Sequence, residues 1–177
     1  VDLPPPAELA ERLTAVGLEV EGAERVGQGL EGVVAARIAE ARPHPQADKL
    51  SVTRVDAGGG RTLQVVCGAR NWQVGDVVPL AAAGTRLPGG LEIGKATLRG
   101  VESEGMLCSE KELGLSGEAG GLLILDPSVR PGTPLPALLE DTLLAGNVTP
   151  NRPDALPHPG IARQGAALTH GSPRPPP

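Results

Sequence analysis

Aromatic side chains are almost absent from this sequence of 177 residues, which has no phenylalanine, no tyrosine and a single tryptophan, Trp72. Hydrophobic residues still make up 40% of the chain, so valine, leucine, isoleucine and alanine must fill the core. Because these side chains bury less area each, we expect modest stability unless a partner covers further surface. The 25 glycines and 19 prolines indicate many turns and little helix.

Cysteine, histidine and long apolar runs are also scarce, and each scarcity excludes a class of protein. Two cysteines far apart in the sequence, Cys67 and Cys108, predict free buried thiols in a reducing cytoplasm. The cysteines and the three histidines lack the spacing of metal ligands, so no metal site is expected. No run of about 18 apolar residues is present, and the acidic start "VDLPPPAELAERL" is unlike a signal peptide. The sequence therefore predicts a cytoplasmic protein with no membrane partner.

Positive charge is in the minority, with 16 basic against 21 acidic residues and a net charge of −5. This balance argues against a general binder of polyanions. The charge is uneven, however: residues 1–36 have a net charge of −5, residues 37–111 of +2 and residues 112–177 of −2. The middle segment alone has an electrostatic case for binding nucleic acid, and that case is weak by itself.

The pattern of apolar residues changes twice along the chain. Leu9, Leu13 and Val16 share one helical face, which predicts an N-terminal helix that ends at Gly17. From Val33 onward, short alternating segments separated by glycine turns predict a small closed barrel of about five strands. Near the C-terminus, prolines 157 and 159 flank or break the start of a candidate helix, and "THGSPRPPP" has the composition of a disordered tail.

The segment "LRGVESEGMLCSEKEL", residues 98–113, contains a signal for a local turn. Ser109 and Glu112 have the spacing of a helix capping box, in which each side chain bonds the backbone of the other residue. Gly114 follows where such a turn would stop. Cys108 has no neighbouring histidine, so we expect a buried, inert thiol rather than a nucleophile.

Catalysis by the same segment is not expected. Glu102 and Glu104 alternate along a strand, and no partner in sequence register is present to raise the pKa of one of them for acid–base chemistry. What remains is a surface made by Arg99, Ser103 and Met106, next to glycines that permit close approach of a backbone.

Several stretches resemble a known module. "HPQADKLSVTRVDAG", "VVCGARN", "GTRLPGGLEI" and "LRGVESEGMLCSEKELGL" are similar to the tRNA-binding OB module of synthetases and of free-standing tRNA-binding proteins. With "VTPNRPDAL" and "AELAERLTAVGLEVEG", residues 1–156 resemble the β subunit of bacterial phenylalanine–tRNA ligase. The resemblance implies a mainly β fold, with an OB-fold barrel at 33–150 inserted in a small α+β N-terminal domain. That domain would comprise residues 1–32 and a returning segment at 151–177 that ends in a disordered, proline-rich tail.

The resemblance also implies which residues face RNA. The matching positions are Lys49, Asn71, Arg99, Ser103 and Met106, and the charge pattern adds Arg54 and Lys95. In this interpretation Lys49 and Arg99 neutralise phosphates, whereas Asn71 and Ser103 bond a base edge or a 2′-hydroxyl group and Met106 offers an apolar contact. The alternative is that Asn71 and Ser103 only satisfy loop backbone and that Met106 belongs to the core.

The scarcity of aromatics weakens the expected affinity. OB modules that bind single strands stack bases on aromatic side chains, at about 1–3 kcal/mol per base, and only Trp72 is available here. We therefore expect the isolated chain to bind tRNA with micromolar or weaker affinity that depends strongly on salt.

The function implied by the resemblance is that of a tRNA-binding module, which supports ATP-dependent charging of tRNA with phenylalanine in the complete ligase. Its partners would be tRNA and the α subunit, in an assembly of two α and two β subunits, but not DNA. No cofactor is expected in this chain; ATP and Mg²⁺ are implied for the complete enzyme, whose catalytic site the chain lacks. Two alternatives stay open: a stand-alone tRNA-binding protein, and a truncated, inactive remnant or scaffold.

Overall fold

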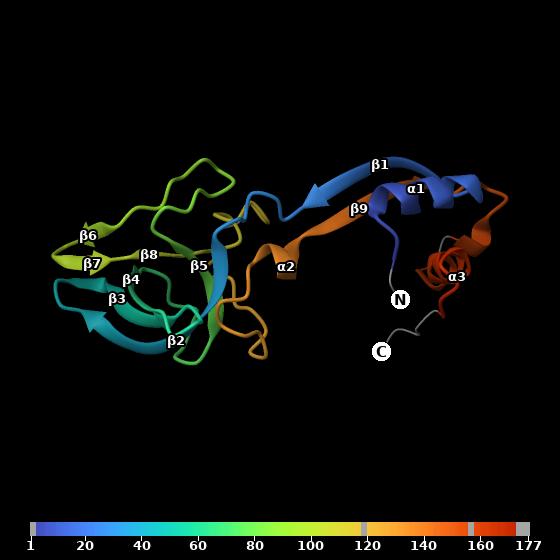
Figure 1. The fold of residues 1–177 in the computed structure, drawn as a ribbon. Helices are drawn as coiled ribbons and strands as arrows, with labels where there is room; N and C mark the ends of the chain where they lie inside the picture. The colour runs from blue at the N-terminus through green and yellow to red at the C-terminus, as the bar shows by residue number, and fades with distance from the viewer. Residues whose placement is uncertain (1–2, 118–119, 156–157, 173–177) are drawn as a thin grey trace. The chain divides into compact units, whose positions relative to one another are not determined.

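The computed structural model describes residues 3–117, 120–155 and 158–172, and the chain divides into two compact units (Figure 1). The terminal unit comprises residues 1–26 and 141–177, and the barrel unit comprises residues 27–140. The barrel unit is thus inserted in sequence between the two halves of the terminal unit. Within the described ranges, no helix has the length and apolar character needed to cross a membrane.

The terminal unit begins with helix α1 (Pro6–Ala15), as the sequence predicts. Prolines precede this helix, and their fixed φ suits its first turn. At its C-terminal end Gly17 adopts a φ of 84°, so that the amide of Leu18 donates to the carbonyl of Leu13 and the amide of Gly17 to that of Thr14. This is the Schellman arrangement, which satisfies the last carbonyls of the helix.

The rest of the terminal unit is a two-stranded ribbon and a second helix. β1 (Glu19–Val26) pairs antiparallel with β9 (Asp141–Asn147), which brings the two halves of the unit together. The chain continues through a 3₁₀ turn, η1 (Pro153–Ala155), to helix α3 (His158–Leu168). Arg152 donates to the carbonyl of Val16 at 2.7 Å and pairs with Asp154 at 3.1 Å, which lowers the pKa of Asp154. The unit is small and α+β, as expected.

The barrel unit has a main sheet with the strand order β4-β3-β2-β5-β8. These strands are β2 (Val33–His44), β3 (Ala47–Asp56), β4 (Thr62–Cys67), β5 (Val77–Ala82) and β8 (Gly105–Leu107). The sheet almost closes between its edges, because the amide of Glu104, just before β8, donates to the carbonyl of Gln64 in β4 at 2.9 Å. A partly open five-stranded barrel of this kind is the OB fold, which confirms the expected fold class.

Smaller elements lie between and after the barrel strands. The segment between β5 and β8 forms a hairpin of β6 (Ala96–Leu98) and β7 (Val101–Ser103), and the short helix α2 (Pro136–Leu139) ends the unit. The predicted glycine turn at 58–60 joins β3 to β4, with all three glycines at positive φ.

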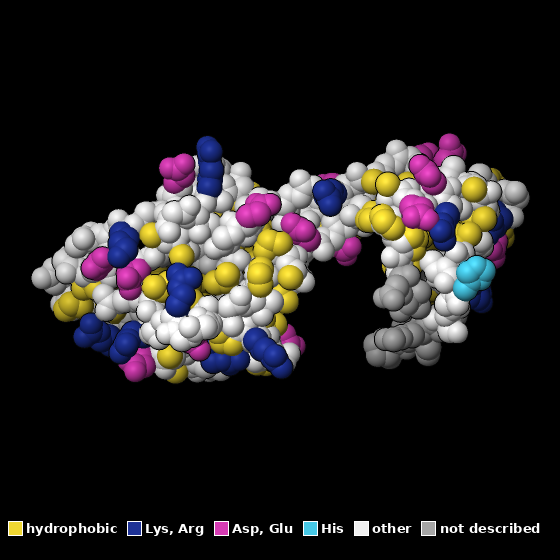
Figure 2. All heavy atoms as spheres, viewed as in Figure 1, with side chains coloured by type: hydrophobic (Ala, Val, Ile, Leu, Met, Phe, Trp, Pro, Cys, Tyr) yellow, Lys and Arg dark blue, Asp and Glu magenta, His cyan; other side chains and the backbone are white. Residues whose placement is uncertain are grey.

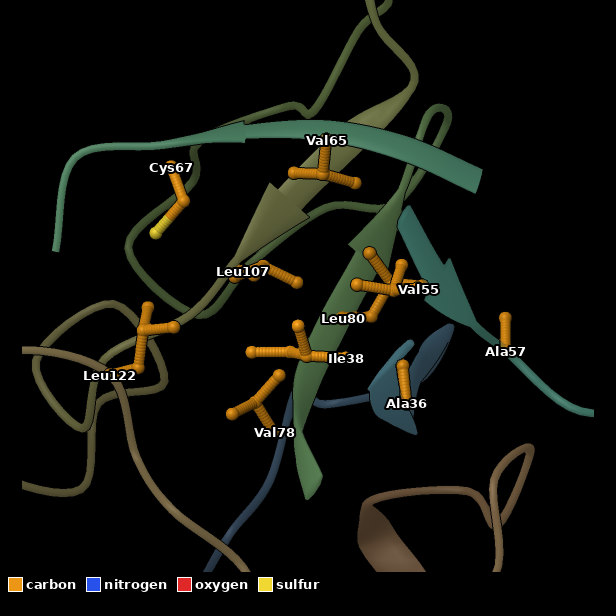
Figure 3. Packing of buried hydrophobic residues seen from close by; sticks show 10 residues of the cluster. All are labelled: Ala36, Ile38, Val55, Ala57, Val65, Cys67, Val78, Leu80, Leu107 and Leu122. Atoms are coloured by element: carbon orange, nitrogen blue, oxygen red, sulfur yellow. The ribbon is translucent and has the colours of Figure 1, made fainter. Parts of the chain in front are cut away.

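The barrel core contains only aliphatic and sulfur-bearing side chains at its centre (Figure 3). Its buried members are Ala36, Ile38, Val55, Ala57, Val65, Cys67, Val78, Leu80, Leu107 and Leu122. The alternation in β4 agrees with the predicted alternating segments, since Val65 and Cys67 belong to this core and Leu63 packs against it. Trp72 packs at the margin of the core, and its indole N–H donates to the carbonyl of Ala69 at 2.8 Å.

Two local features concern the bulge in β2 and the start of α3. In β2, Ala39 has no partner in β3 between the pairs Ile38–Val55 and Glu40–Arg54. The candidate helix near the C-terminus is formed as α3 and contains Pro159 in its first turn; proline is tolerated there because the first amides of a helix have no intrahelical acceptor. Most of the predicted disordered tail, residues 173–177, lies outside the described residues.

Candidate nucleic-acid interface

Two hairpin turns of the barrel unit meet at one edge of the barrel. The turn between β6 and β7 has two central residues, Arg99 and Gly100, at φ values of 46° and 83°. Positive φ at both positions is what a type I′ turn requires. His44, at the end of β2, is 5% exposed; its Nε2 donates to the carbonyl of Leu98 at 3.0 Å and its Nδ1 accepts from the amide of Gln46 at 3.1 Å. The histidine thus joins the β6–β7 turn to the turn between β2 and β3.

Basic side chains gather where these turns meet. Arg99 Nη1 donates to the carbonyl of Gln46 at 3.3 Å, and Arg70 Nη2 donates to the carbonyl of Asp48 at 2.8 Å. Lys49 is the next residue in the same segment. All three cations are exposed, and none of them belongs to an ion pair with a described residue. We call Lys49, Arg70 and Arg99 the basic edge.

The outer face of β2, β3 and β4 carries a shallow groove of about 490 Å³, in which one of the two arginines is ion-paired. Arg54 lines the groove and lies 3.8 Å from the carboxylate of Glu40. Lys95, nearby, lies 3.8 Å from Glu102 and 3.6 Å from Glu104. In Figure 2, acidic and basic side chains alternate over the region of β3, β6 and β7. These two predicted cations therefore have competing partners.

A second hollow, of about 530 Å³, lies beside the β6–β7 hairpin and has mainly apolar walls. We call it the apolar cleft; its largest apolar lining residues are Leu91, Ile93, Leu98, Met106, Leu107 and Leu122. Met106 is half-buried and packs against a second core cluster, so it serves the core and the cleft at once. Ser103 lines the same cleft.

Asn71 and Ser103 both use their polar atoms on the protein backbone. The Asn71 side chain bonds both backbone groups of Leu122, donating to its carbonyl at 2.9 Å and accepting from its amide at 2.8 Å. Ser103 is 3% exposed; its hydroxyl accepts from the amide of Val66 at 3.0 Å and donates to the carbonyl of Gly105 at 2.9 Å. This geometry favours the structural role that the sequence left open for both residues, and their contact with RNA stays a prediction.

The capping box next to the cleft is formed. The Glu112 carboxylate accepts from the amide of Ser109 at 2.6 Å and from its hydroxyl at 2.8 Å. The thiols are not poised for chemistry, because burial, followed by the charge of Glu112, raises the pKa of Cys108 to about 12, and burial also raises the pKa of Cys67. The described residues contain no group of three or more histidine, cysteine, aspartate or glutamate side chains placed to bind a metal ion.

The structure thus divides the seven predicted residues among four environments. Lys49 and Arg99 belong to the basic edge, and Ser103 and Met106 line the apolar cleft. Asn71 supports the wall of the cleft through Leu122. Arg54 lines the outer groove and Lys95 pairs with Glu104 at its margin.

Two further basic residues were not among the predicted positions. Arg42 lines the outer groove with Arg54. In the sequence, Arg42 stands two positions after Glu40, so both side chains lie on the same polar face of β2, and this spacing could have identified it. Arg70 had no such signal, because its proximity to the turn at 46–48 arises only in the folded barrel.

Comparisons with known proteins give a family match and highly similar relatives. The family described as "Putative tRNA binding domain" matches residues 33–134. The β subunit of phenylalanine–tRNA ligase from Anaeromyxobacter dehalogenans is 69% identical over 170 residues, which are 95% of this chain and 21% of that protein. The same subunit from Bordetella parapertussis is 55% identical over 164 residues, 92% of this chain and 20% of that protein. Among solved structures, the C-terminal domain of Plasmodium vivax p43 has a TM-score of 0.42 at 21% identity and covers 56% of each chain.

The chain spans about a fifth of the length of these curated relatives, and the similarity includes the terminal unit as well as the barrel. The chain therefore belongs to the family of the "Putative tRNA binding domain", in the form found in the N-terminal part of phenylalanine–tRNA ligase β subunits.

Proposed function

We propose that this chain binds tRNA through the basic edge of its barrel, as the N-terminal module of a phenylalanine–tRNA ligase β subunit. The observation that carries the proposal is the coincidence of the family match with a geometric feature. The matched residues, 33–134, contain all three cations of the basic edge, and two of these are anchored on the same turn.

The basic edge suits the phosphates of a folded RNA. Each guanidinium group donates one hydrogen bond to a backbone carbonyl, which limits its rotation while its other N–H groups face solvent. An anchored guanidinium loses less conformational entropy on binding phosphate than a free side chain does. Arg54 and Lys95 contribute less, since a phosphate must first displace the carboxylates beside them.

The activity of the complete enzyme belongs to the same proposal. The relatives are ligase subunits, so the full assembly would use ATP and Mg²⁺ to charge tRNA with phenylalanine, with an α subunit as partner. Among the described residues, no three histidine, cysteine, aspartate or glutamate side chains are grouped to hold a metal ion. In this proposal the contribution of the chain is to hold tRNA.

A stand-alone tRNA-binding protein is the second candidate, and the terminal unit argues against it. A free-standing binder needs only the barrel, whereas the similarity to β subunits extends over 95% of the chain, including α1 and the β1–β9 ribbon. A pure scaffold is the third candidate, and it differs from the others in binding no tRNA.

Fluorescence anisotropy with labelled tRNA tests the proposed binding and distinguishes it from a pure scaffold. We expect a Kd in the micromolar range or weaker at physiological salt, with poor competition by DNA of the same sequence. Arg99→Ala should weaken binding several-fold, because it removes one phosphate contact. Arg61→Ala is the matched control, since Arg61 is also exposed and lies at the opposite end of β3. Absence of binding, or equal loss in both variants, would contradict the proposal.

A further inference from the structure

We propose that the apolar cleft receives one unstacked base of a single-stranded part of the RNA, while Arg70 and Arg99 hold the flanking phosphates. This inference rests on the proposed tRNA binding and adds to it a subsite for a nucleobase. The proposed phosphate contacts involve only the basic edge, and this inference assigns a ligand to the apolar cleft as well.

The walls of the cleft suit the face of a base. Leu91 and Leu98 are 52% and 40% exposed and line the same hollow, so they offer a joined apolar surface that a ligand can cover. The volume of about 530 Å³ is within the range of small-molecule sites. Met106 lies in the same lining, and its polarisable thioether makes favourable contacts with aromatic rings.

Two glutamates, Glu92 and Glu112, line the cleft, and the carboxylate of Glu112 is bonded to Ser109. The cations next to the lining favour a nucleotide over an apolar peptide. Ala69 and Leu98 both line the cleft, and each is followed directly by a residue of the basic edge, Arg70 and Arg99. Both guanidinium groups are held on the turn at 46–48. A base in the cleft would thus have two cations beside it for its neighbouring phosphates, whereas an uncharged peptide would make no use of them.

The cleft also explains how an aromatic-poor barrel binds a base. The single tryptophan, Trp72, packs against the core and bonds Ala69, so it does not present an open face for stacking. The leucine and methionine side chains of the cleft would contact the face of the base in place of an aromatic ring. The polar groups of Ser103 and Ser109 in the lining already bond protein atoms. The site therefore recognises the face of a base more than its edge, and we expect little preference among the four bases.

Met106 is the only methionine of the chain, so a methyl-¹³C-methionine label gives one NMR signal that reports on the cleft. The probe is a single-stranded RNA hexamer of mixed sequence, compared with the same strand in a duplex. We expect the methyl signal to move upfield with the single strand, because the methyl group would lie over the ring of a base. The duplex should leave the signal in place, because its bases are stacked and paired.

A pair of variants separates the cleft from the basic edge. Leu98→Ser removes an exposed wall of the cleft, and Val74→Ser changes an apolar residue that is 55% exposed and lies outside the cleft lining. We expect Leu98→Ser to weaken binding of the hexamer about fivefold, because the variant loses part of the contact with one base. Val74→Ser should leave the affinity unchanged, and circular dichroism should show both variants folded.

Each alternative outcome overturns a different statement. If tRNA binds but the hexamer leaves the Met106 signal in place and Leu98→Ser equals Val74→Ser, the base subsite is wrong and the proposed function stands. If neither tRNA nor the hexamer binds, both fall. If an uncharged leucine-rich hexapeptide moves the signal and RNA does not, the cleft is a peptide site and the inference is refuted.

Discussion

The salt dependence of tRNA binding follows from the number of cations at the basic edge, which are free of carboxylate partners. The basic edge contains three such residues, Lys49, Arg70 and Arg99, while Arg54 and Lys95 are paired with glutamates. Each neutralised phosphate contributes about 0.7–0.9 to the slope of log K against log salt. We therefore expect a slope of about −2 to −3, so that affinity falls roughly 20- to 60-fold between 50 and 200 mM KCl.

Removing two of these cations should flatten the dependence. The double variant Arg70→Ala/Arg99→Ala retains one contact, so its slope should be about −1 and its affinity should fall only about fourfold over the same interval. Anisotropy titrations at 50, 100 and 200 mM KCl measure both slopes, with Arg61→Ala as the control of equal charge change per site.

Two results would refute this reasoning. A wild-type slope of about −5 or steeper would mean that cations in and beside the outer groove, such as Arg42, Arg54 and Lys95, also contact phosphate. An unchanged slope in the double variant would show that the RNA lies elsewhere on the barrel. In either case the basic edge would not be the main electrostatic contact.

Three further predictions concern the barrel itself, and chemical denaturation measures each of them. Gly105→Ala should destabilise the chain by about 1–3 kcal/mol, since the new Cβ would lie 2.6 Å from the carbonyl of Ala81; Gly89→Ala, with no atom within 4 Å, should be near neutral, and equal effects would refute the argument. Asn71→Ala should cost about 1–3 kcal/mol by leaving the backbone of the opposite loop unpaired, and a cost near zero would show that water replaces the amide. Because burial raises the pKa of Cys108 from 9.0 to about 12, the free energy of unfolding should be fully retained below pH 9 and fall between pH 9 and 12, more steeply than in Cys108→Ala; parallel curves would contradict a protonated buried thiol.

The architecture could be predicted because its signals are local in sequence. The helix at Leu9–Val16, the glycine turn at 58–60 and the alternation in β4 each depend on residues within a few positions of one another. The capping box of Ser109 and Glu112 is of the same kind, and it forms as expected. The OB-fold class came from the resemblance to a known module, and the nearly closed five-stranded barrel confirms it.

The site was only partly predictable, because its decisive contacts join residues far apart in sequence. Asn71 was expected at an RNA surface, but its amide pairs with Leu122, 51 positions away. Ser103 bonds the amide of Val66 across the barrel seam. Lys95 was selected for its charge, yet the folded hairpin places it beside two carboxylates. Arg70 was overlooked for the same reason, since its anchor on Asp48 exists only once the barrel has formed.

A photo-crosslinking map tests the central claim most directly. tRNA that contains 4-thiouridine would be irradiated with the whole chain, and the crosslinked peptides identified by mass spectrometry. The account predicts crosslinks in the segments around the basic edge, residues 44–50, 67–71 and 96–106. Crosslinks confined to the glycine turn at 58–60, or to the terminal unit, would contradict it.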